Sequence, residues 1–362
     1  MMKNRSVIIS GGGTGGHIYP ALAVGRKLVE KSPTILITFV GSTRPLEKKI
    51  MDEQGVRFIP MAIEGIKGRG LKSVKALVLL PFAFLKSLSL LVRIKPDLVI
   101  GVGGFSSGPI VLLASWLKTP TLILEQNAYP GFTNRLLVRW VRRAAVAFES
   151  SLRYFRGKGT VLGNPVREEF HALPAKPREE RLTILVFGGS QGSHFLNERI
   201  TAALIHLQAK KEMIRVFHQT GEADCDWVRE AYTAGGFKDS IVAPYFRDMA
   251  GYFGQSDLVV SRAGATTVAE LIAARKASIL VPFAKAADDH QTLNARELEA
   301  VGGAMAIPES AFTPELFTEK IFYFIENRRR LDAMERNIET LRKGNAAEKI
   351  AHLCFDLMEG KA

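Results

Sequence analysis

Val7-Ile8-Ile9-Ser10-Gly11-Gly12-Gly13-Thr14-Gly15-Gly16-His17 reads as a short apolar run, a glycine-rich turn and the start of a helical stretch. The same order returns at 182–193, where Leu-Thr-Ile-Leu-Val-Phe leads into Gly-Gly-Ser-Gln-Gly-Ser. A buried strand, a glycine turn and a helix are the opening unit of a doubly wound α/β fold. Two such openings in 362 residues predict two Rossmann-like halves.

Short apolar runs alternate with longer helical patterns along the whole chain. The runs do not alternate strictly between apolar and polar residues, which is typical of parallel strands covered by helices on both faces. Helical stretches such as 18–31 and 264–275 lie between them. We predict strands at 7–10, 35–40, 57–60, 98–101, 121–125 and 144–148 in the first half, and at 182–187, 214–219, 240–243, 258–261 and 277–281 in the second.

A boundary lies near 163–181, where Gly-Asn-Pro-Val-Arg runs into a charged segment with further prolines. We therefore expect one domain at 1–164 and a second at 165–344. The last stretch, 345–362, has apolar residues at helical spacing and can pack back on the first domain or remain with the second.

The first turn formally contains G-x-G-x-x-G, but a dinucleotide site also needs an acidic residue at the end of the second strand. That strand ends at 39–43 as Phe-Val-Gly-Ser-Thr, without a carboxylate. A P-loop is excluded as well, because His17 stands where Gly-Lys-Ser/Thr is required. The sequence thus disfavours both NAD or FAD binding and a Walker-type nucleotide site.

The same turn is still suited to an anion, since glycines let the backbone approach and the helix offers free N–H groups and its positive end. Thr14 adds a hydroxyl and His17 an imidazole. A positive helix end disfavours the imidazolium form, so we expect a neutral His17 that can accept a proton. The alternative is that His17 only caps the helix.

Three segments of the second half carry polar groups at expected strand ends. Ser190 and Gln191 occupy the second glycine turn, which could equally be a tight turn without a ligand. Glu270 lies two turns into a helix after a glycine-containing turn, where a carboxylate can accept hydrogen bonds from a ribose diol or simply lie at the surface. Gln291 and Asn294 are three apart and can share one helix face suited to sugar hydroxyls.

The charge balance is strongly basic, at +13. Attraction to nucleic acid or to an anionic lipid surface would each explain it, and so would an arbitrary surface excess. Two distant cysteines, Cys225 and Cys354, argue against a disulfide framework, and no signal peptide fits before the first glycines. We expect a protein that acts on the cytoplasmic side of a membrane.

The apolar surplus lies mainly at 71–95, a stretch rich in Leu, Val and Phe with lysines and arginines at its edges. Its uncharged part, 76–85, is too short to span a bilayer. Together with the basic residues from 67 on and the basic-aromatic run at 139–143, it predicts a peripheral contact with an anionic membrane. A pair of buried helices with solvated lysines is the alternative.

Six segments occur in an order that resembles the bacterial peptidoglycan glycosyltransferases that make lipid II, the MurG type. The resemblance covers residues 7 to about 300, and together the motifs are specific although each alone is weak. They are Gly-Gly-Thr-Gly-Gly-His at 12–17, Glu-Gln-Asn at 125–127, Gly-Asn-Pro-Val-Arg at 163–167, Gly-Gly-Ser-Gln-Gly at 188–192, Ser-Arg-Ala-Gly-Ala at 261–265 and the segment with Gln291 and Asn294.

The resemblance implies a GT-B fold, in which two Rossmann-like parallel-sheet domains face each other across a cleft. It also implies inverting transfer of N-acetylglucosamine from UDP-N-acetylglucosamine to the C4 hydroxyl of MurNAc in lipid I, undecaprenyl-pyrophosphoryl-MurNAc-pentapeptide. His17, Glu125 and Asn134 match positions associated with catalysis or the acceptor. Positions that match the donor site are Thr14, Gly15, Gly16, Asn127, Arg167, Ser190, Gln191, Phe246, Arg262, Ala265, Glu270, Gln291 and Asn294.

Two positions depart from the family pattern. Phe105 stands where Tyr is common on the acceptor side, so a hydroxyl there is not essential. Phe246 stands where an aliphatic residue is common, so we expect contact with uracil through its apolar surface or its backbone.

We expect no cofactor and no metal. Asp224-Cys225-Asp226 matches the Asp-x-Asp string of metal-dependent transferases, but it lies in a polar loop or helix start. Helix ends, loop amides and Arg262 or Arg167 would then stabilise the leaving UDP. We predict His17 as the general base, with Glu125 as its rival.

Other functions remain open at this stage. A UDP-GlcNAc 2-epimerase or another glycolipid transferase would share the fold, and an epimerase would need neither an acceptor nor a membrane patch. A non-catalytic basic scaffold is disfavoured, because no basic stripe with interleaved aromatics indicates nucleic-acid binding. Proteins of a cell-wall synthesis complex are further expected partners.

Overall fold

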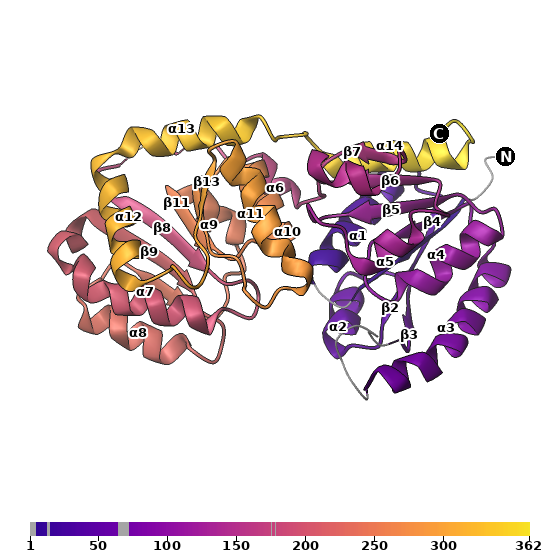
Figure 1. Ribbon diagram of the computed structural model, residues 1–362, viewed down its shortest axis with the longest axis horizontal. Coiled ribbons are helices and arrows are strands. Elements are labelled where there is room, and N and C mark those ends of the chain that lie inside the picture. Colours follow the sequence, from indigo (N-terminus) through magenta and orange to yellow (C-terminus); the bar gives the residue numbers. More distant parts are fainter. Residues whose placement is uncertain (1–4, 13–14, 64–71, 175, 178) are drawn as a thin grey trace. The chain divides into compact units, whose positions relative to one another are not determined.

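The computed structural model describes residues 5–12, 15–63, 72–174, 176–177 and 179–362. Its chain divides into two compact units, unit 1 comprising Met1–Val166 with Asn345–Ala362, and unit 2 comprising Arg167–Gly344. The chain thus passes from unit 1 to unit 2 two residues beyond the boundary expected from the sequence, and it returns for its last helix (Figure 1).

Unit 1 contains a seven-stranded sheet in the order β3-β2-β1-β4-β5-β6-β7, and all neighbouring strands are parallel. Helices cover the sheet on both faces (Figure 1). The strands are β1 (Ser6–Ser10), β2 (Leu36–Ser42), β3 (Phe58–Met61), β4 (Leu98–Gly101), β5 (Thr121–Glu125), β6 (Arg143–Val146) and β7 (Gly159–Val161); the helices are α1 (Gly15–Lys31), α2 (Pro45–Glu53), α3 (Lys72–Ile94), α4 (Ser107–Trp116), α5 (Phe132–Leu137), the 3₁₀ helix η1 (Glu149–Tyr154) and α14 (Ala346–Met358).

Unit 2 contains a six-stranded sheet in the order β10-β9-β8-β11-β12-β13, again parallel throughout. Its strands are β8 (Leu182–Phe187), β9 (Ile214–Gln219), β10 (Ile241–Ala243), β11 (Leu258–Ser261), β12 (Ser278–Leu280) and β13 (Ala304–Ala306); its helices are α6 (Glu168–His171), α7 (His194–Leu207), η2 (Gln208–Met213), α8 (Cys225–Ala234), α9 (Met249–Gln255), α10 (Ala265–Ala274), η3 (Ala287–Asp289), α11 (His290–Ala300), α12 (Pro314–Glu326) and α13 (Arg328–Glu339).

Both sheets confirm the predicted α/β class with doubly wound parallel strands. The central strands β4, β5 and β8 are buried along their whole length, which explains why their sequences are apolar without alternation. In each sheet the strand order reverses beside the first strand of the unit, between β1 and β4 and between β8 and β11. Ligands of open α/β sheets bind at such switch points, outside the carboxyl ends of the strands.

The C-terminal helix α14 belongs to unit 1, where it packs on α1 (Figure 1). Ile350, Cys354 and Leu357 share a hydrophobic cluster with Ile18 and Leu28 of α1. The helix is therefore held by burial of its apolar face.

A buried carboxylate fixes the segment that leads into unit 2. Asp257 is fully buried before β11, and its Oδ2 accepts from the Thr183 N–H at 2.8 Å and from Lys176 Nζ at 2.9 Å. Burial alone would raise the pKa of Asp257, but these donors hold it below its usual value. The ion pair ties the segment before β8 to the sheet.

Within the described residues, no helix is both long enough and apolar enough to cross a bilayer.

Candidate functional site

The first glycine turn follows β1 at the switch point of unit 1. Gly11 has φ +151°, and a Cβ there would lie 2.3 Å from Val102 Cγ2, so no larger residue fits. Gly15 and Gly16 form the first two residues of α1, and Thr14 lies outside the described residues. In the described part of this turn, glycine backbone therefore lines the edge of the sheet, as expected for an anion site.

His17 is half-buried at the third position of α1. It lies against the turn after β4, where a Cβ on Gly103 (φ +96°) would be 2.8 Å from His17 Nε2. Phe105, two residues further on, is 36% exposed. The structure therefore brings the predicted base and the predicted acceptor-side residue to neighbouring strand ends.

Glu125 is the last residue of β5, and its carboxylate accepts hydrogen bonds that hold the loop after this strand. Its Oε1 accepts from the Asn127 N–H at 3.0 Å and from Asn127 Nδ2 at 3.2 Å. Its Oε2 accepts from the Gly131 N–H at 2.9 Å and from Asn134 Nδ2 at 2.8 Å. Burial raises the pKa of the Glu125 carboxyl, and these four donors oppose the rise.

This placement changes the roles expected for Glu125 and Asn134. Both are buried, and Asn134 Nδ2 also donates to the Leu124 carbonyl at 3.1 Å. Because both carboxylate oxygens accept from the loop, Glu125 braces the loop rather than offering a free oxygen to an acceptor hydroxyl. Asn134 belongs to the same brace, whereas Asn127 is half-buried and Gly131 is exposed.

The second glycine turn follows β8 at the switch point of unit 2, and its tip carries the exposed Ser190 and Gln191. Gly192 has φ +75°, and a Cβ there would lie 1.8 Å from the Thr220 carbonyl oxygen. Ser193 then caps α7 by accepting from the Leu196 N–H. Two exposed polar side chains thus precede a capped helix N-terminus, as expected for an anion site.

Arg262 lies behind this turn, and its guanidinium is committed to internal partners. Nη2 donates to Ser193 Oγ at 2.9 Å and pairs with Glu309 Oε1 at 2.5 Å. Nη1 donates to the Val281 carbonyl at 3.1 Å. Burial lowers the pKa of Arg262, and Glu309 opposes this. Arg262, one of the two arginines expected to stabilise the leaving UDP, thus links two loops in this structure.

Arg167 and Glu270 form a second, more open pair. Arg167 Nη2 lies 3.6 Å from Glu270 Oε1, and the two side chains are 41% and 13% exposed. Burial raises the pKa of Glu270 to about 7, while the charge of Arg167 opposes the rise. Ala265 starts α10, the helix that carries Glu270. Arg167 is thus the more accessible of the two predicted arginines.

Gln291, Asn294 and Phe246 also act largely inside unit 2. Gln291 Oε1 accepts from the backbone N–H groups of Ala263 and Phe283, at 3.2 and 3.0 Å. Asn294 is fully buried and donates to the Ala263 carbonyl at 3.1 Å, so it is not presented to sugar hydroxyls as its helix spacing suggested.

Phe246 is buried with its ring stacked on Tyr252, at a centroid distance of 3.9 Å. Its N–H donates to Gln219 Oε1 at 2.8 Å, and Gln219 Nε2 donates to the Gly189 carbonyl at 2.9 Å. Gln219 therefore links Phe246 to the second glycine turn. Sequence reasoning missed Gln219, although its place at the end of a strand next to β8 was a usable signal.

The two carboxylates of the Asp-x-Asp string have different surroundings. Asp224 accepts from Asn197 and Trp227 and pairs with His194 at 3.0 Å, whereas the side chain of Asp226 is 91% exposed beside Arg229. Across the residues that the structure describes, no three His, Cys, Asp or Glu side chains come together as metal ligands would.

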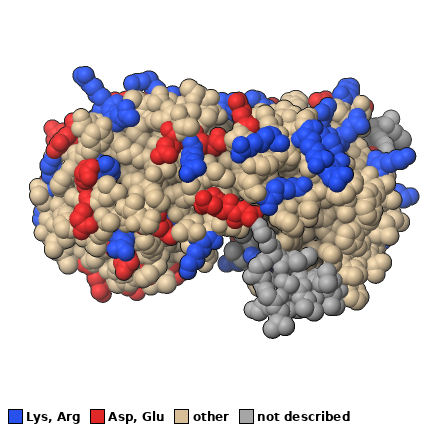
Figure 2. Space-filling view, in the orientation of Figure 1, with Lys and Arg blue, Asp and Glu red and all other residues tan. Residues whose placement is uncertain are grey.

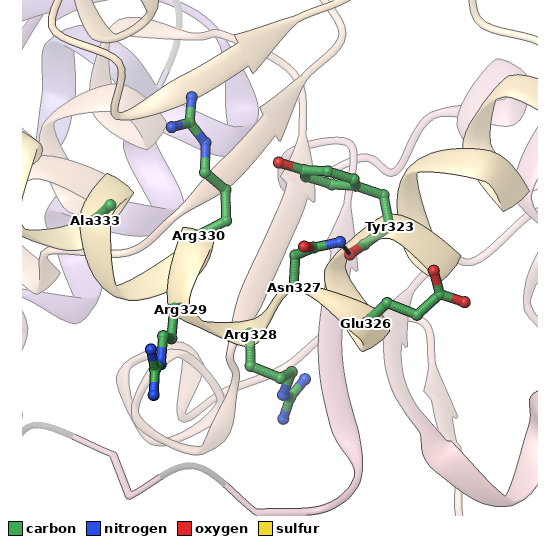
Figure 3. A pocket seen from close by; sticks show the side chains of 7 residues that line it. All are labelled: Tyr323, Glu326, Asn327, Arg328, Arg329, Arg330 and Ala333. Atoms are coloured by element: carbon green, nitrogen blue, oxygen red, sulfur yellow. Dashed lines mark hydrogen bonds between the residues drawn. The ribbon is translucent and has the colours of Figure 1, made fainter.

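A cavity in unit 2 is lined by residues of α12 and α13 and the residue between them. Figure 3 shows that its three arginines, Arg328, Arg329 and Arg330, point in different directions. Arg328 donates to the Arg181 carbonyl and pairs with Asp257. The arginines do not converge on a common ligand position, so we assign no site there.

Comparisons with known proteins cover nearly the whole chain. Residues 7–146 match the glycosyltransferase family 28 N-terminal domain, and residues 183–353 match the family 28 C-terminal domain. The UDP-N-acetylglucosamine--N-acetylmuramyl-(pentapeptide) pyrophosphoryl-undecaprenol N-acetylglucosamine transferase of Myxococcus xanthus is 42% identical, with 99% of this chain and 94% of the relative covered. The protein of the same name from Syntrophus aciditrophicus is 41% identical, with 97% and 98% covered.

Solved structures agree with the fold. The crystal structure of Acinetobacter baumannii MurG matches with a TM-score of 0.78 at 30% identity, covering 97% of this chain and 99% of that one. A UDP-GlcNAc 2-epimerase from Neisseria meningitidis, bound to UDP-GlcNAc, matches with a TM-score of 0.65 at 15% identity, covering 97% and 100%. The second likeness shows the shared fold alone.

The bracing role of Glu125 predicts the effect of Glu125→Gln. A glutamine has one acceptor oxygen, so its amide would face two of the four donors and leave a buried N–H unpaired. We expect a loss of about 1–3 kcal/mol in the free energy of unfolding, together with faster hydrogen exchange at the Gly131 amide. Urea denaturation and amide exchange measure both. Glu53→Gln, an exposed position on α2, is the control, and an unchanged stability of Glu125→Gln would refute the brace.

Proposed function

The chain belongs to glycosyltransferase family 28, and from this we infer that it transfers N-acetylglucosamine from UDP-N-acetylglucosamine to undecaprenyl-pyrophosphoryl-MurNAc-pentapeptide, giving lipid II for peptidoglycan synthesis. The observation that carries this function is about 40% identity, over almost the full length of both chains, to transferases named for this reaction. The matching N- and C-terminal family domains support it.

We propose that unit 2 holds the donor. The exposed Ser190 and Gln191 at the head of α7 suit the diphosphate, because unpaired N–H groups and the positive helix end favour an anion there. Ionised Glu270 suits the ribose diol. Phe246 is buried, so we expect it to meet uracil through its backbone rather than its ring. Gln291 and Asn294 would contribute by fixing the loop after β11.

We propose that Arg167, rather than Arg262, stabilises the departing UDP. Arg262 already pairs with Glu309 and donates to Ser193 and Val281, and its side chain is almost fully enclosed. Arg167 is far more exposed; its Nη2 lies 3.6 Å from Glu270 Oε1, and its guanidinium lies 4.9 Å from the centroid of the Phe170 ring. A positioned cation and loop amides can stabilise the developing diphosphate charge without a divalent ion.

We propose that His17 removes the proton of the acceptor hydroxyl. The C4 oxygen of MurNAc attacks C1 of GlcNAc, the bond from C1 to the diphosphate oxygen breaks, and the proton passes to the imidazole. This single displacement inverts the configuration at C1. The positive end of α1 favours a neutral imidazole. Its rival Glu125 is enclosed by four donors within its own loop.

The central experiment follows UDP release with UDP-GlcNAc and a short-chain lipid I analogue, with and without EDTA. We expect the rate to require the acceptor and to be unchanged by EDTA. His17→Ala should lower kcat by about 10²–10⁴-fold, the range of general-base contributions, while His352→Ala on the exposed face of α14 should leave it unchanged. An epimerised sugar formed without acceptor would refute the function. Loss of activity in EDTA would refute the metal-free mechanism, and near-normal kcat in His17→Ala would refute the base.

The pKa of Glu270, which burial raises to about 7, predicts a pH-dependent donor affinity. The carboxylate predominates above pH 7 and can accept from both ribose hydroxyls, whereas the protonated acid below pH 7 has lost acceptor capacity. We therefore expect the Kd for UDP-GlcNAc to be about tenfold higher at pH 6 than at pH 8. Calorimetric titration checks this, and Glu270→Gln should flatten the dependence. If the Kd for UDP-GlcNAc still depends on pH in Glu270→Gln, the titrating group is not Glu270.

We propose that an exposed face of α3 contacts the membrane on its cytoplasmic side. Phe82 and Leu85 are each 65% exposed, and Leu88 and Val92 continue the same face. Trp116, at the end of the adjoining α4, is also exposed. The part of unit 1 that carries α3 and α4 is largely tan in Figure 2, whereas Lys and Arg cluster elsewhere over unit 1 with few acidic residues among them.

The proposed membrane contact includes the segments 67–95 and 139–143, and the structure describes the first of them only in part. Of the expected segment 67–95, residues 67–71 lie outside the described residues, and so do the side chains of 72–78. In the second expected stretch, Arg139 and Trp140 are exposed, while Val141 is buried. Apolar side chains that enter the lipid interface are one feature of a peripheral anchor, and the exposed Lys86 and Arg93 on α3 supply the basic groups that favour an anionic surface.

Phe82→Glu tests this contact directly. Placing a charge where an aromatic ring enters the interface removes about 2 kcal/mol of apolar burial, so we expect at least tenfold weaker binding to phosphatidylglycerol vesicles. Cosedimentation measures it, and Ile205→Glu on α7 of unit 2 is the matched control, since Ile205 is 69% exposed. Activity on a soluble short-chain acceptor should be retained. Equal binding of both variants would refute this surface.

A further inference from the structure

Glu47 lies buried beneath the first glycine turn, and neither the motifs nor the proposed mechanism uses it. It belongs to the first turn of α2 and is 1% exposed. Its Oε2 accepts from the Ser42 N–H at 3.1 Å and from the Ser42 hydroxyl. The carboxylate is thereby anchored at the end of β2, where the strand itself offers no acidic residue.

The other oxygen of Glu47 fills the space beside two glycines. A Cβ on Gly12 or on Gly41 would lie 1.9 Å from Glu47 Oε1. Real Cβ atoms do not approach so closely, so each position accepts only glycine while the carboxylate is in place. Glu47 Oε1 therefore lies directly beside the backbone of the first turn at Gly12 and occupies the space that a side chain there would need.

Gly12 also contacts the turn at Gly103–Gly104, which lies against His17. A Cβ on Gly104 (φ +78°) would be 2.6 Å from the Gly12 carbonyl oxygen, so the two backbones touch. Gly103, which precedes Gly104 in this turn, lies against the His17 imidazole, where a Cβ would be 2.8 Å from Nε2. Glu47, Gly12, the Gly103–Gly104 turn and His17 thus form one contiguous stack.

We propose that Glu47 is a positioning residue that fixes the His17 imidazole through this stack. The inference rests on the proposed function, in which His17 takes the acceptor proton. Glu47 is too deeply buried to touch a substrate, so its effect must pass through the backbone. Displacements of about 1 Å in a reacting group are enough to lower a rate by roughly 10²-fold. Closely packed glycine backbone leaves little free volume, so a shift of one segment displaces its neighbour.

Variants of Glu47 can show whether the length of its side chain or its charge matters. Glu47→Ala removes the contact with Gly12, and Glu47→Asp shortens it by one methylene, whereas Glu47→Gln keeps its shape and an oxygen for Ser42. We expect kcat to fall by about tenfold or more in the alanine and aspartate variants and to be largely restored in the glutamine variant. The KM for UDP-GlcNAc should change less than kcat, since Ser190, Gln191 and Glu270 lie in unit 2 and only Thr14, Gly15, Gly16 and Asn127 of the expected donor positions lie in unit 1. Glu53→Ala on the same helix is the control.

A double-mutant cycle with His17→Ala then identifies the route. If Glu47 acts through His17, adding Glu47→Ala to His17→Ala should cause no further loss of kcat. Full additivity of the two losses would overturn the proposal, as would a KM that rises as much as kcat falls. If the alanine variant does not fold, the comparison of Glu47→Asp with Glu47→Gln decides.

A second readout does not depend on catalysis. The ring resonances of His17, assigned by their absence in His17→Ala, should shift in Glu47→Asp and stay in place in Glu53→Ala. Unchanged resonances in Glu47→Asp would overturn the positioning role even if lipid II is formed. A shift in a protein without transfer activity would instead leave the positioning role standing and refute the proposed function.

Discussion

Close backbone approach at the two switch points is the constraint on which the rest of this structure depends. In unit 1, Gly11 leaves no room for a Cβ beside Val102, and Gly12 leaves none beside Glu47. In unit 2, Gly192 and the Thr220–Gly221 turn meet in the same way. Each contact brings peptide N–H groups to the carboxyl edge of a parallel sheet. An anion can be held there because no side chain stands between it and the backbone.

Such turns need rigid support, and buried polar side chains provide it. Glu125 folds the loop after β5, Arg262 joins Ser193 to the strand end at Val281, and Gln219 joins Gly189 to Phe246. Each brace has partners on at least two segments. Removing one member would leave a buried donor or acceptor unpaired. The half-exposed residues His17 and Arg167 and the exposed Ser190 can then meet substrates from loops that do not have to reorganise.

The sequence predicts the central strands well and the edge strands only in part. Strands such as 98–101, 121–125, 182–187 and 258–261 match because unbroken apolar runs are typical of strands buried on both faces. Of the edge strands, β3 and β10 lie within one residue of the predicted 57–60 and 240–243, whereas the short strands β7 and β13 are missed. Glycine turns likewise located both switch points. Of the overlooked residues, Glu47 reaches Gly12 and Glu309 reaches Arg262 only through the fold, whereas the position of Gln219 at the end of a strand was a usable signal.

Side-chain direction accounts for most of the remaining differences at the site. Spacing places Gln291 and Asn294 on one helix face, but that face packs on the Ala263 backbone instead of facing outward. Glu125 and Arg262 have the chemistry of a base and of a phosphate ligand, yet each is enclosed by internal partners. A family motif can therefore require a residue because it shapes the loop and not because it touches the substrate. A large loss of kcat on substitution does not separate these two roles, since both displace the same reacting atoms. Donor affinity, ring resonances and coupling between variants do separate them.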